Sequence, residues 1–179
     1  MNIDQLRLGV DFGRVIHGGP LVHGGADTVF LDGDEEEALR SPATEGVYEV
    51  LPELVAAFGG RAWIISKCGD RVRRRTLAWL DHHDFYARTG IPRGNVRFCR
   101  KRAEKAGHCA GLGITHMIDD RVDVHRAIRE IVPYRYLFGP QKRPAPDWVR
   151  KPRTWAEAGE LISADIRPAP RPPATRRSR

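Results

Sequence analysis

The 179-residue sequence lacks any hydrophobic run long enough to span a membrane, and its N-terminus lacks a basic region followed by an apolar stretch. We therefore expect neither a transmembrane segment nor a secretory signal peptide. Cysteine is scarce: Cys68, Cys99 and Cys109 are odd in number, and their spacing fits no metal-binding motif. Reduced thiols and a cytoplasmic location are the expectation.

Basic residues are in excess, with a formal net charge of +7, but the excess belongs to one end of the chain. Residues 1–138 contain 20 Lys and Arg against 19 Asp and Glu, whereas residues 139–179 contain 10 against 4. A nearly neutral main domain argues against a nucleic-acid-binding core. The tail, residues 167–179, has four prolines, five arginines and no acid. It is predicted to be disordered and to make weak contacts with nucleic acid or another anionic surface.

Strand-like and helix-like patterns alternate along residues 1–138, which predicts an α/β fold with a doubly wound parallel sheet. Short apolar strands are predicted at residues 6–10, 61–66, 95–99, 114–118 and 134–138. Helices are predicted at residues 46–58, 69–80, 100–112 and 122–132, with a connector at 86–94. Pro52 interrupts the first helical pattern, and we expect that helix to begin near Leu51.

Two further segments complete the predicted organisation. Residues 17–46 are rich in glycine and acids, and we expect a loop or small β-hairpin that forms a flap over the site. The acids of residues 32–37 are interpreted as a solvated face. Residues 139–166 are predicted to form a linker and a short helix, which a capping box from Thr154 to Glu157 begins.

The stretch around Asp11 is the strongest functional signal in the chain. Asp11 ends the first apolar strand and is followed at once by a turn containing Gly13. An aspartate at the carboxyl end of a central strand lies where open α/β sheets bind their ligands. Polar groups also lie at the ends of two other predicted strands, namely Ser66 and Lys67 at the second strand and Asp119 and Asp120 at the fourth. Two lysines, Lys101 and Lys105, lie on the predicted helix before the fourth strand.

In this order, the polar groups resemble the four motifs of the haloacid dehalogenase (HAD) superfamily over residues 6–138. Their most specific part is the pair Asp119-Asp120 after an apolar strand. The first motif of that family reads Asp-x-Asp-Gly-x-(Val/Leu/Ile), and here Gly13 replaces its second aspartate. The resemblance implies a HAD-like, Rossmannoid domain, and the chain is too short for a large cap domain.

The resemblance also implies Mg²⁺-dependent phosphoryl transfer or hydrolysis of a phosphorylated small molecule or phosphate ester. Asp11 would attack phosphorus and form an aspartyl-phosphate. Mg²⁺ would be held by Asp11, the backbone carbonyl of Gly13, and Asp119 and Asp120, because it prefers oxygen ligands.

The remaining implied roles concern the phosphate. Ser66 and Lys67 would bind the substrate at the second strand end. Lys105 would pair with Asp11 and supply fixed positive charge where negative charge develops. Lys101 is the second candidate for this lysine. Alternatively, Ser66 caps the next helix, and the Asp119 and Asp120 pair caps the helix that follows it.

Gly13 leaves the chemistry open. The missing aspartate would protonate the leaving oxygen and then activate water, a contribution of about 10²–10⁴-fold. The protein is then a slow phosphatase or phosphotransferase for good leaving groups, an enzyme that takes its acid from His17 or Asp27, or a phosphate- and Mg²⁺-binding pseudoenzyme with a regulatory role. His17 is also readily interpreted as an ordinary loop histidine. A dehalogenase needs no such acid, but it needs no Mg²⁺ either, and Asp119-Asp120 indicates a metal site.

Overall fold

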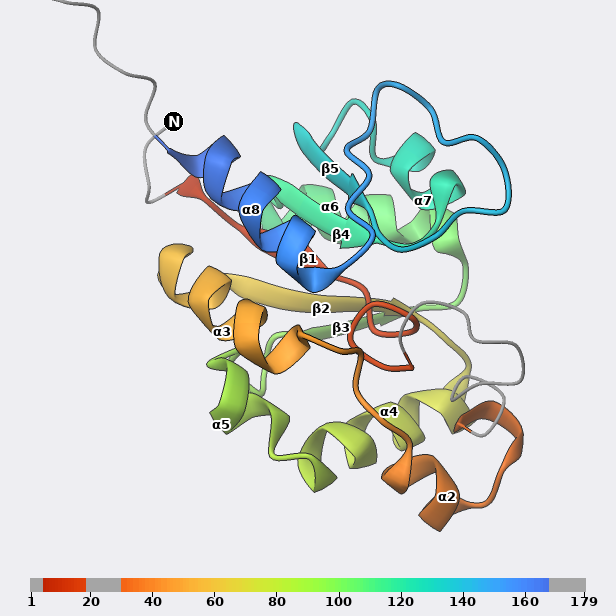
Figure 1. Cartoon of the computed structure of the whole chain (residues 1–179). Coiled ribbons are helices and arrows are strands. Elements are labelled where there is room, and N and C mark those ends of the chain that lie inside the picture. Colours follow the sequence, from red (N-terminus) through yellow and green to blue (C-terminus); the bar gives the residue numbers. More distant parts are fainter. Residues whose placement is uncertain (1–4, 19–29, 168–179) are drawn as a thin grey trace, which may run out of the picture.

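The computed structural model describes residues 5–18 and 30–167, with a parallel β-sheet at the centre (Figure 1). Five strands pair in the order β3-β2-β1-β4-β5, and every pairing is parallel. The strands are β1 (Leu8–Val10), β2 (Ala62–Lys67), β3 (Val96–Cys99), β4 (His116–Asp119) and β5 (Tyr134–Leu137). The predicted α/β fold is confirmed, and the described residues contain no large inserted domain.

Central strand β1 fixes the register of the sheet. Leu8 lies opposite Ala62 on one side and His116 on the other. All three residues of β1 are buried, as expected for a parallel strand covered on both faces. Gly9 allows close packing here, because a Cβ atom at this position would lie 2.6 Å from the sulfur of Met117 and would force that side chain to shift.

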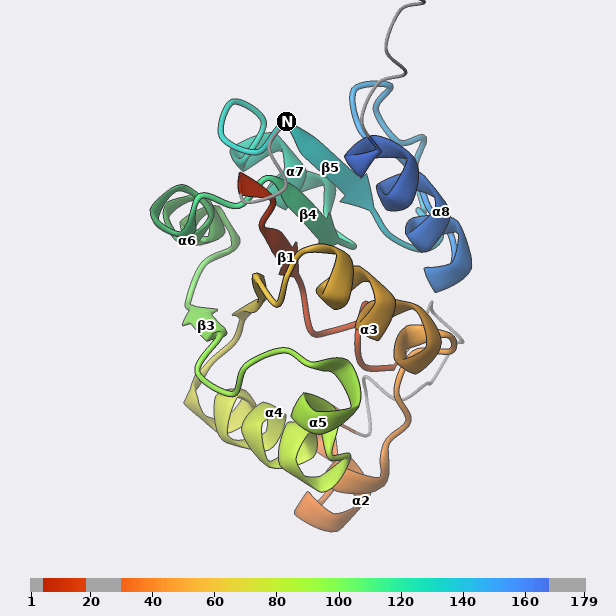
Figure 2. The ribbon, with the colours of Figure 1, turned by 90° about the vertical axis from the view of Figure 1, so that its left-hand side faces the viewer.

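Helices cover both faces of the sheet. They are α2 (Glu35–Arg40), α3 (Val47–Ala57), α4 (Asp70–His82), α5 (Phe85–Thr89), α6 (Lys105–Leu112), α7 (Val122–Ala127) and α8 (Trp155–Ile166), with the 3-10 helix η2 (Arg102–Glu104) before α6. Figure 2 shows α3 and α8 on one side of the sheet and α6 and α7 on the other. The larger hydrophobic core includes residues of α3, α4, α5 and α8, whereas a smaller core lies beneath α6 and α7.

The predicted start of α3 near Leu51 is wrong. The helix begins at Val47, directly after Gly46 in the left-handed conformation, and Pro52 lies inside it. Proline removes one backbone donor from a helix. The buried stripe that includes Val47, Leu51 and Leu54 outweighs this loss, since helix stability comes mainly from burying an apolar face.

The segment predicted as a loop or hairpin over residues 17–46 instead contains α2. The side chain of Asp34 accepts a hydrogen bond from the Glu37 backbone, and the side chain of Glu37 accepts one from the Asp34 backbone. The acids of this run are exposed, as predicted. Residues 19–29, where the remainder of the predicted flap lies, are outside the described residues.

Three other helix boundaries differ from the predictions. Most of α5 lies within the connector predicted at residues 86–94. The helix predicted at 100–112 divides into η2 and α6, and the helix predicted at 122–132 ends at Ala127. These helices are short. Sequence periodicity has little to detect over one or two turns.

The C-terminal helix α8 packs on α3. Thr154 caps it by accepting a hydrogen bond from the Glu157 backbone, and the helix continues to Ile166. This is one half of the predicted capping box, because the Glu157 side chain accepts its hydrogen bond from the Arg153 backbone and not from Thr154. Trp155 is fully buried and its indole donates a 2.9 Å hydrogen bond to the carbonyl of Val15. Among the described residues, none of the helices is both long and apolar enough to cross a membrane. The predicted tail beyond Arg167 lies outside that part of the chain.

Candidate functional site

The candidate site lies at the carboxyl edge of the sheet, between β1 and β4. The chain passes from β1 to β2 on one side, and β4 later pairs with β1 on the other side. This is the switch point at which open α/β sheets form ligand-binding crevices. Asp11 follows β1 directly, Asp119 ends β4, and the Asp11 backbone donates a 2.9 Å hydrogen bond to the carbonyl of Ile118.

Three carboxylates meet at this edge. Oxygen atoms of Asp11, Asp119 and Asp120 all lie within 4.8 Å of one another. Asp119 is completely buried and Asp11 is 7% exposed. Because clustered carboxylate oxygens are the ligands that Mg²⁺ and Ca²⁺ prefer, this buried cluster can hold a metal ion.

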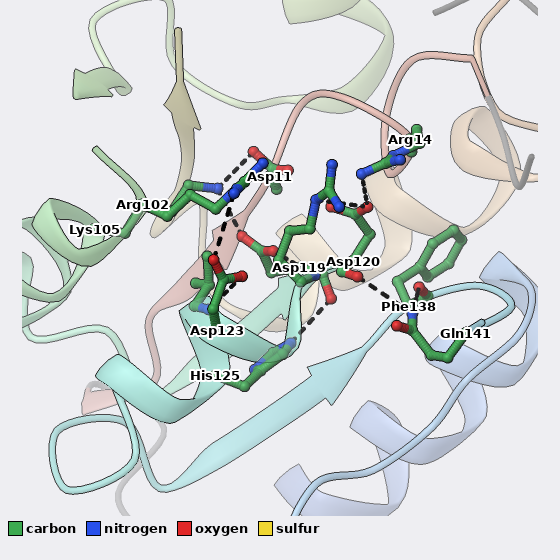
Figure 3. A network of polar contacts seen from close by, with 12 residues as sticks. Asp11, Arg14, Arg102, Lys105, Asp119, Asp120, Asp123, His125, Phe138 and Gln141 are labelled. Atoms are coloured by element: carbon green, nitrogen blue, oxygen red, sulfur yellow. Dashed lines mark hydrogen bonds and ion pairs between the residues drawn. The ribbon is translucent and has the colours of Figure 1, made fainter. Parts of the chain in front are cut away.

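Lys105, the first residue of α6, joins two of these carboxylates (Figure 3). Its Nζ atom donates hydrogen bonds to Oδ1 of Asp11 at 2.7 Å and to Oδ2 of Asp119 at 2.6 Å. Only 2% of the Lys105 residue is exposed. Burial would lower the pKa of its ammonium group, but the two neighbouring carboxylates outweigh burial and raise that pKa above its usual value. Lys101, the alternative candidate, is exposed at the start of η2.

Burial and mutual repulsion raise the pKa values of two carboxyl groups in the cluster. Burial is the main factor that raises the pKa of Asp11 to about 6, and Asp119 adds to the rise while Lys105 opposes it. Burial, followed by Asp11 and Asp119, raises the pKa of Asp120 to about 7, against the influence of Arg14. Raised carboxyl pKa values mean that the ionised cluster favours a further cation.

Arg14 is a residue of this site that the sequence analysis missed. Its guanidinium lies 2.5 Å from Oδ2 of Asp120, and the Arg121 guanidinium lies 3.5 Å from the same atom. Arg14 has a φ of 60°, the left-handed conformation, which costs an L-residue about 1 kcal/mol or more. In the motif Asp-x-Asp-Gly-x-(Val/Leu/Ile), position 14 corresponds to the glycine. The replacement of this glycine by arginine was the signal in the sequence that could have indicated Arg14 as a site residue.

A cavity of about 250 Å³ opens beside the cluster, and it is large enough for a small phosphorylated group. Its lining includes every predicted site residue except the fully buried Asp119, namely Asp11, Gly13, Ser66, Lys67, Lys105 and Asp120. Ser66 lies within β2, and the residue at the cap of α4 is Gly69, so Ser66 does not cap that helix.

The two carboxylate oxygens of Asp119 have different partners. Its Oδ2 atom faces Lys105, whereas its Oδ1 atom accepts a 2.9 Å hydrogen bond from the Arg121 backbone just before α7. Its backbone carbonyl accepts a 2.9 Å hydrogen bond from the ring of buried His125. The residue at the cap of α7 is Arg121, and that cap has no side-chain hydrogen bond, so the Asp119 and Asp120 pair does not cap this helix. The Asp119 carboxylate belongs to the charged cluster.

His17 is poorly suited to act as the missing acid. It is completely buried, contacts Ser41 through Nε2 at 2.7 Å, and stacks on Phe12 with 5.3 Å between ring centres. Burial lowers the pKa of His17 to about 4, with a further contribution from His83. The ring is therefore neutral at pH 7. Asp27, the other candidate acid, lies outside the described residues.

Gly13 lines the cavity with open space around it. A Cβ atom added there would meet no heavy atom within 4 Å, and the residue does not have a left-handed φ. The fold therefore does not require glycine at this position. The predicted metal contact through the Gly13 carbonyl stays a prediction.

A scan against protein-family models found no match for this chain, and a search of curated proteins found none either.

Proposed function

We propose that the protein is a HAD-like hydrolase or phosphotransferase that acts on phosphate esters with Mg²⁺ and forms an aspartyl-phosphate on Asp11. The observation that supports this most strongly is the Lys105 bridge between Asp11 and Asp119, within a carboxylate cluster at the switch point of the sheet. A simple structural ion pair would need one carboxylate. Here Lys105 contacts two carboxylates, and an oxygen of a third, Asp120, lies within 4.8 Å of theirs. This grouping fits a site that also receives a metal ion.

The proposed reaction has two displacements at phosphorus. With a pKa of about 6, Asp11 is largely ionised at pH 7, and one of its oxygens attacks phosphorus. The ester P–O bond breaks, and its electron pair leaves with the alcohol oxygen. Water, or an acceptor alcohol, then attacks the phosphorus of the aspartyl-phosphate and releases the Asp11 carboxylate.

Electrostatic stabilisation accounts for most of the proposed catalysis. Lys105 holds its positive charge beside Asp11, and Ser66 and Lys67 line the cavity where phosphoryl oxygens would lie. When bound, Mg²⁺ would supply the charge neutralisation that lets an anionic carboxylate approach an anionic phosphate. Asp11, Asp119 and Asp120 are the residues that would hold it.

One observation favours the pseudoenzyme as the second candidate. Gly13 has no side chain to donate a proton, and His17 is neutral and hydrogen-bonded to Ser41. Neither Gly13 nor His17 therefore replaces the missing aspartate as a proton donor. The site then either acts on esters whose leaving groups need no proton, or it binds phosphate without turnover.

The deciding experiment is hydrolysis of acyl, aryl and alkyl phosphates with Mg²⁺ by the wild type and Asp11→Asn. We expect turnover of acyl or aryl phosphates by the wild type, with a phosphoryl adduct on Asp11 in acid-quenched samples. Asp11→Asn should lose both. The matched control is Asp81→Asn, which removes an exposed acid that pairs with exposed Arg93.

The other outcomes separate the candidates. Equal turnover by the wild type and Asp11→Asn would refute Asp11 as the nucleophile. Binding of Mg²⁺ and phosphate with no turnover of any ester would establish the pseudoenzyme.

A further inference from the structure

A second cavity adjoins the one that contains Asp11. Its volume is about 610 Å³, and the two cavities share Arg14, Arg102, Asp120 and Arg121 in their linings. Two of these shared residues, Arg14 and Asp120, form an ion pair (Figure 3). A molecule bound beside Asp11 can therefore extend into the second cavity without crossing an apolar barrier.

The second cavity is strongly basic. Six cations line it against two carboxylates: Arg14, Arg102, Arg121, Arg126, Lys142 and Arg143, with Asp120 and Asp123. Arg14 and Arg121 lie against Asp120, and Arg102 lies 3.5 Å from Asp123. Arg126, Lys142 and Arg143 form no ion pair with any acid among the described residues. Such an excess of like charge in a concave surface favours an anion.

The wall that contributes Lys142 and Arg143 is held against the site by the fold. The Gln141 side chain donates 3.2 Å hydrogen bonds to the carbonyls of Asp120 and Phe138. Backbone hydrogen bonds from Leu137 to Arg150 and from Gly139 to Pro152, at 2.8 and 2.9 Å, join the two ends of the segment. The basic residues are therefore placed beside the acidic cluster by specific contacts.

We propose that this second cavity binds a second anionic group of the substrate. The substrate class is then a small molecule with two separated phosphate-like groups, one placed beside Asp11 and the other among Arg126, Lys142 and Arg143. This inference rests on the proposed function for the role of the first group. The second group would pair with cations that have no ion-pair partner among the described residues, and hydrogen bonds from arginine to phosphate are strong because they are charge-assisted.

The test uses alkyl bisphosphonates of increasing chain length, with an alkyl monophosphonate as the reference. Their carbon–phosphorus bonds resist hydrolysis, so calorimetric titration of the full chain in Mg²⁺ measures binding without turnover. We expect at least one bisphosphonate to bind about tenfold more tightly than the monophosphonate, as one charge-assisted contact allows. The preference should decrease as salt concentration rises.

Variants show where the second group binds. The double variant Arg126→Ala/Arg143→Ala should lose the bisphosphonate preference, and Arg74→Ala, an exposed arginine on α4, should keep it. Equal affinity for the mono- and bisphosphonates at every length would overturn the proposal, as would a double variant that keeps the preference. Tight binding of a phosphorylated oligonucleotide with no preference among the small ligands would also overturn it.

The two proposals fail separately. Because phosphonates are not turned over, a bisphosphonate preference supports the second site even if no ester is hydrolysed. If esters are hydrolysed through Asp11 but no bisphosphonate binds more tightly than the monophosphonate, only the proposal of a second anion site is refuted.

Discussion

Lys105→Met is the most informative perturbation of the charged cluster. Methionine nearly matches the lysine stem in length, so packing is kept while the positive charge is removed. Lys105 is almost completely buried and contacts two carboxylates at 2.7 and 2.6 Å. Removing one partner of a buried ion pair costs about 3–5 kcal/mol. Since two buried carboxylates lose their partner here, we expect the free energy of unfolding at pH 8 without metal to decrease by an amount near the upper end of this range.

The loss should depend on pH in a definite direction. The folded-state pKa values of Asp11 and Asp120 are about 6 and 7, raised from the ordinary 3.8. A raised carboxyl pKa destabilises the fold at pH values above it, and this penalty disappears as pH falls and the groups take up protons. Removing Lys105 raises these pKa values further. The difference from the wild type should therefore be largest at pH 8 and much smaller at pH 5.

Denaturant unfolding at pH 8 and pH 5, with and without Mg²⁺, measures this effect. Mg²⁺ should recover part of the loss at pH 8, because it binds the folded carboxylates and supplies the missing positive charge. Lys101→Met is the matched control, since Lys101 is exposed, and it should change stability by about 0.5 kcal/mol or less. A loss below about 1 kcal/mol for Lys105→Met at pH 8 would refute the assigned electrostatics, since a buried pair costs more to break.

Three further predictions test the rest of the site and the core. Asp120→Asn should remove most of the Mg²⁺-dependent rise in melting temperature, and an unchanged rise would count against the metal site. Gly13→Asp should accelerate alkyl phosphate hydrolysis by about 10²-fold or more and flatten the dependence of rate on leaving-group pKa. Gly13→Asn should do neither. Both variants are compatible with the fold, because a Cβ atom at position 13 meets no heavy atom within 4 Å. Burial lowers the pKa of His116 to about 4, against an opposing effect of Asp165. The unfolded chain therefore binds this proton more readily, and the free energy of unfolding should decrease by about 3 kcal/mol in total as pH falls from 6.5 towards 4. His116→Phe should unfold with a weaker acid dependence in urea titrations at pH 7 and 4.5, and an unaltered dependence would assign the acid sensitivity to other groups.

The sequence predicted the arrangement of the main charged groups because they follow strand ends. Carboxyl ends of parallel strands meet at one edge of a sheet, so a correct strand assignment brings Asp11, Asp119 and Asp120 together. Lys105 could be preferred over Lys101 only through its spacing from Asp119. The structure adds the physical reason, since Lys105 alone is buried against the carboxylates.

The features that sequence reasoning missed depend on local backbone or on tertiary packing. Arg14 reaches Asp120 from a left-handed residue, and no periodic pattern indicates that conformation. His17 is neutral because Phe30 and Trp79 enclose its ring, and both are distant in sequence. The second cavity depends on how the segment after β5 folds back beside α7. The prolines in that segment indicated an extended chain, but they did not indicate which part of the fold it would pack against.

Gly13 and Arg14 together determine which leaving groups suit the proposed reaction. The quoted motif would place an acid and a glycine here, whereas this chain has no acid and a guanidinium paired with Asp120. An arginine side chain does not release its proton, so it cannot protonate a departing oxygen, but it stabilises an oxygen that leaves as an anion. A phosphate or carboxylate leaving group meets this condition, and it is also the kind of group that the cations of the second cavity would hold. The missing acid and the basic cavity are separate observations, and both favour a substrate whose leaving group is itself anionic.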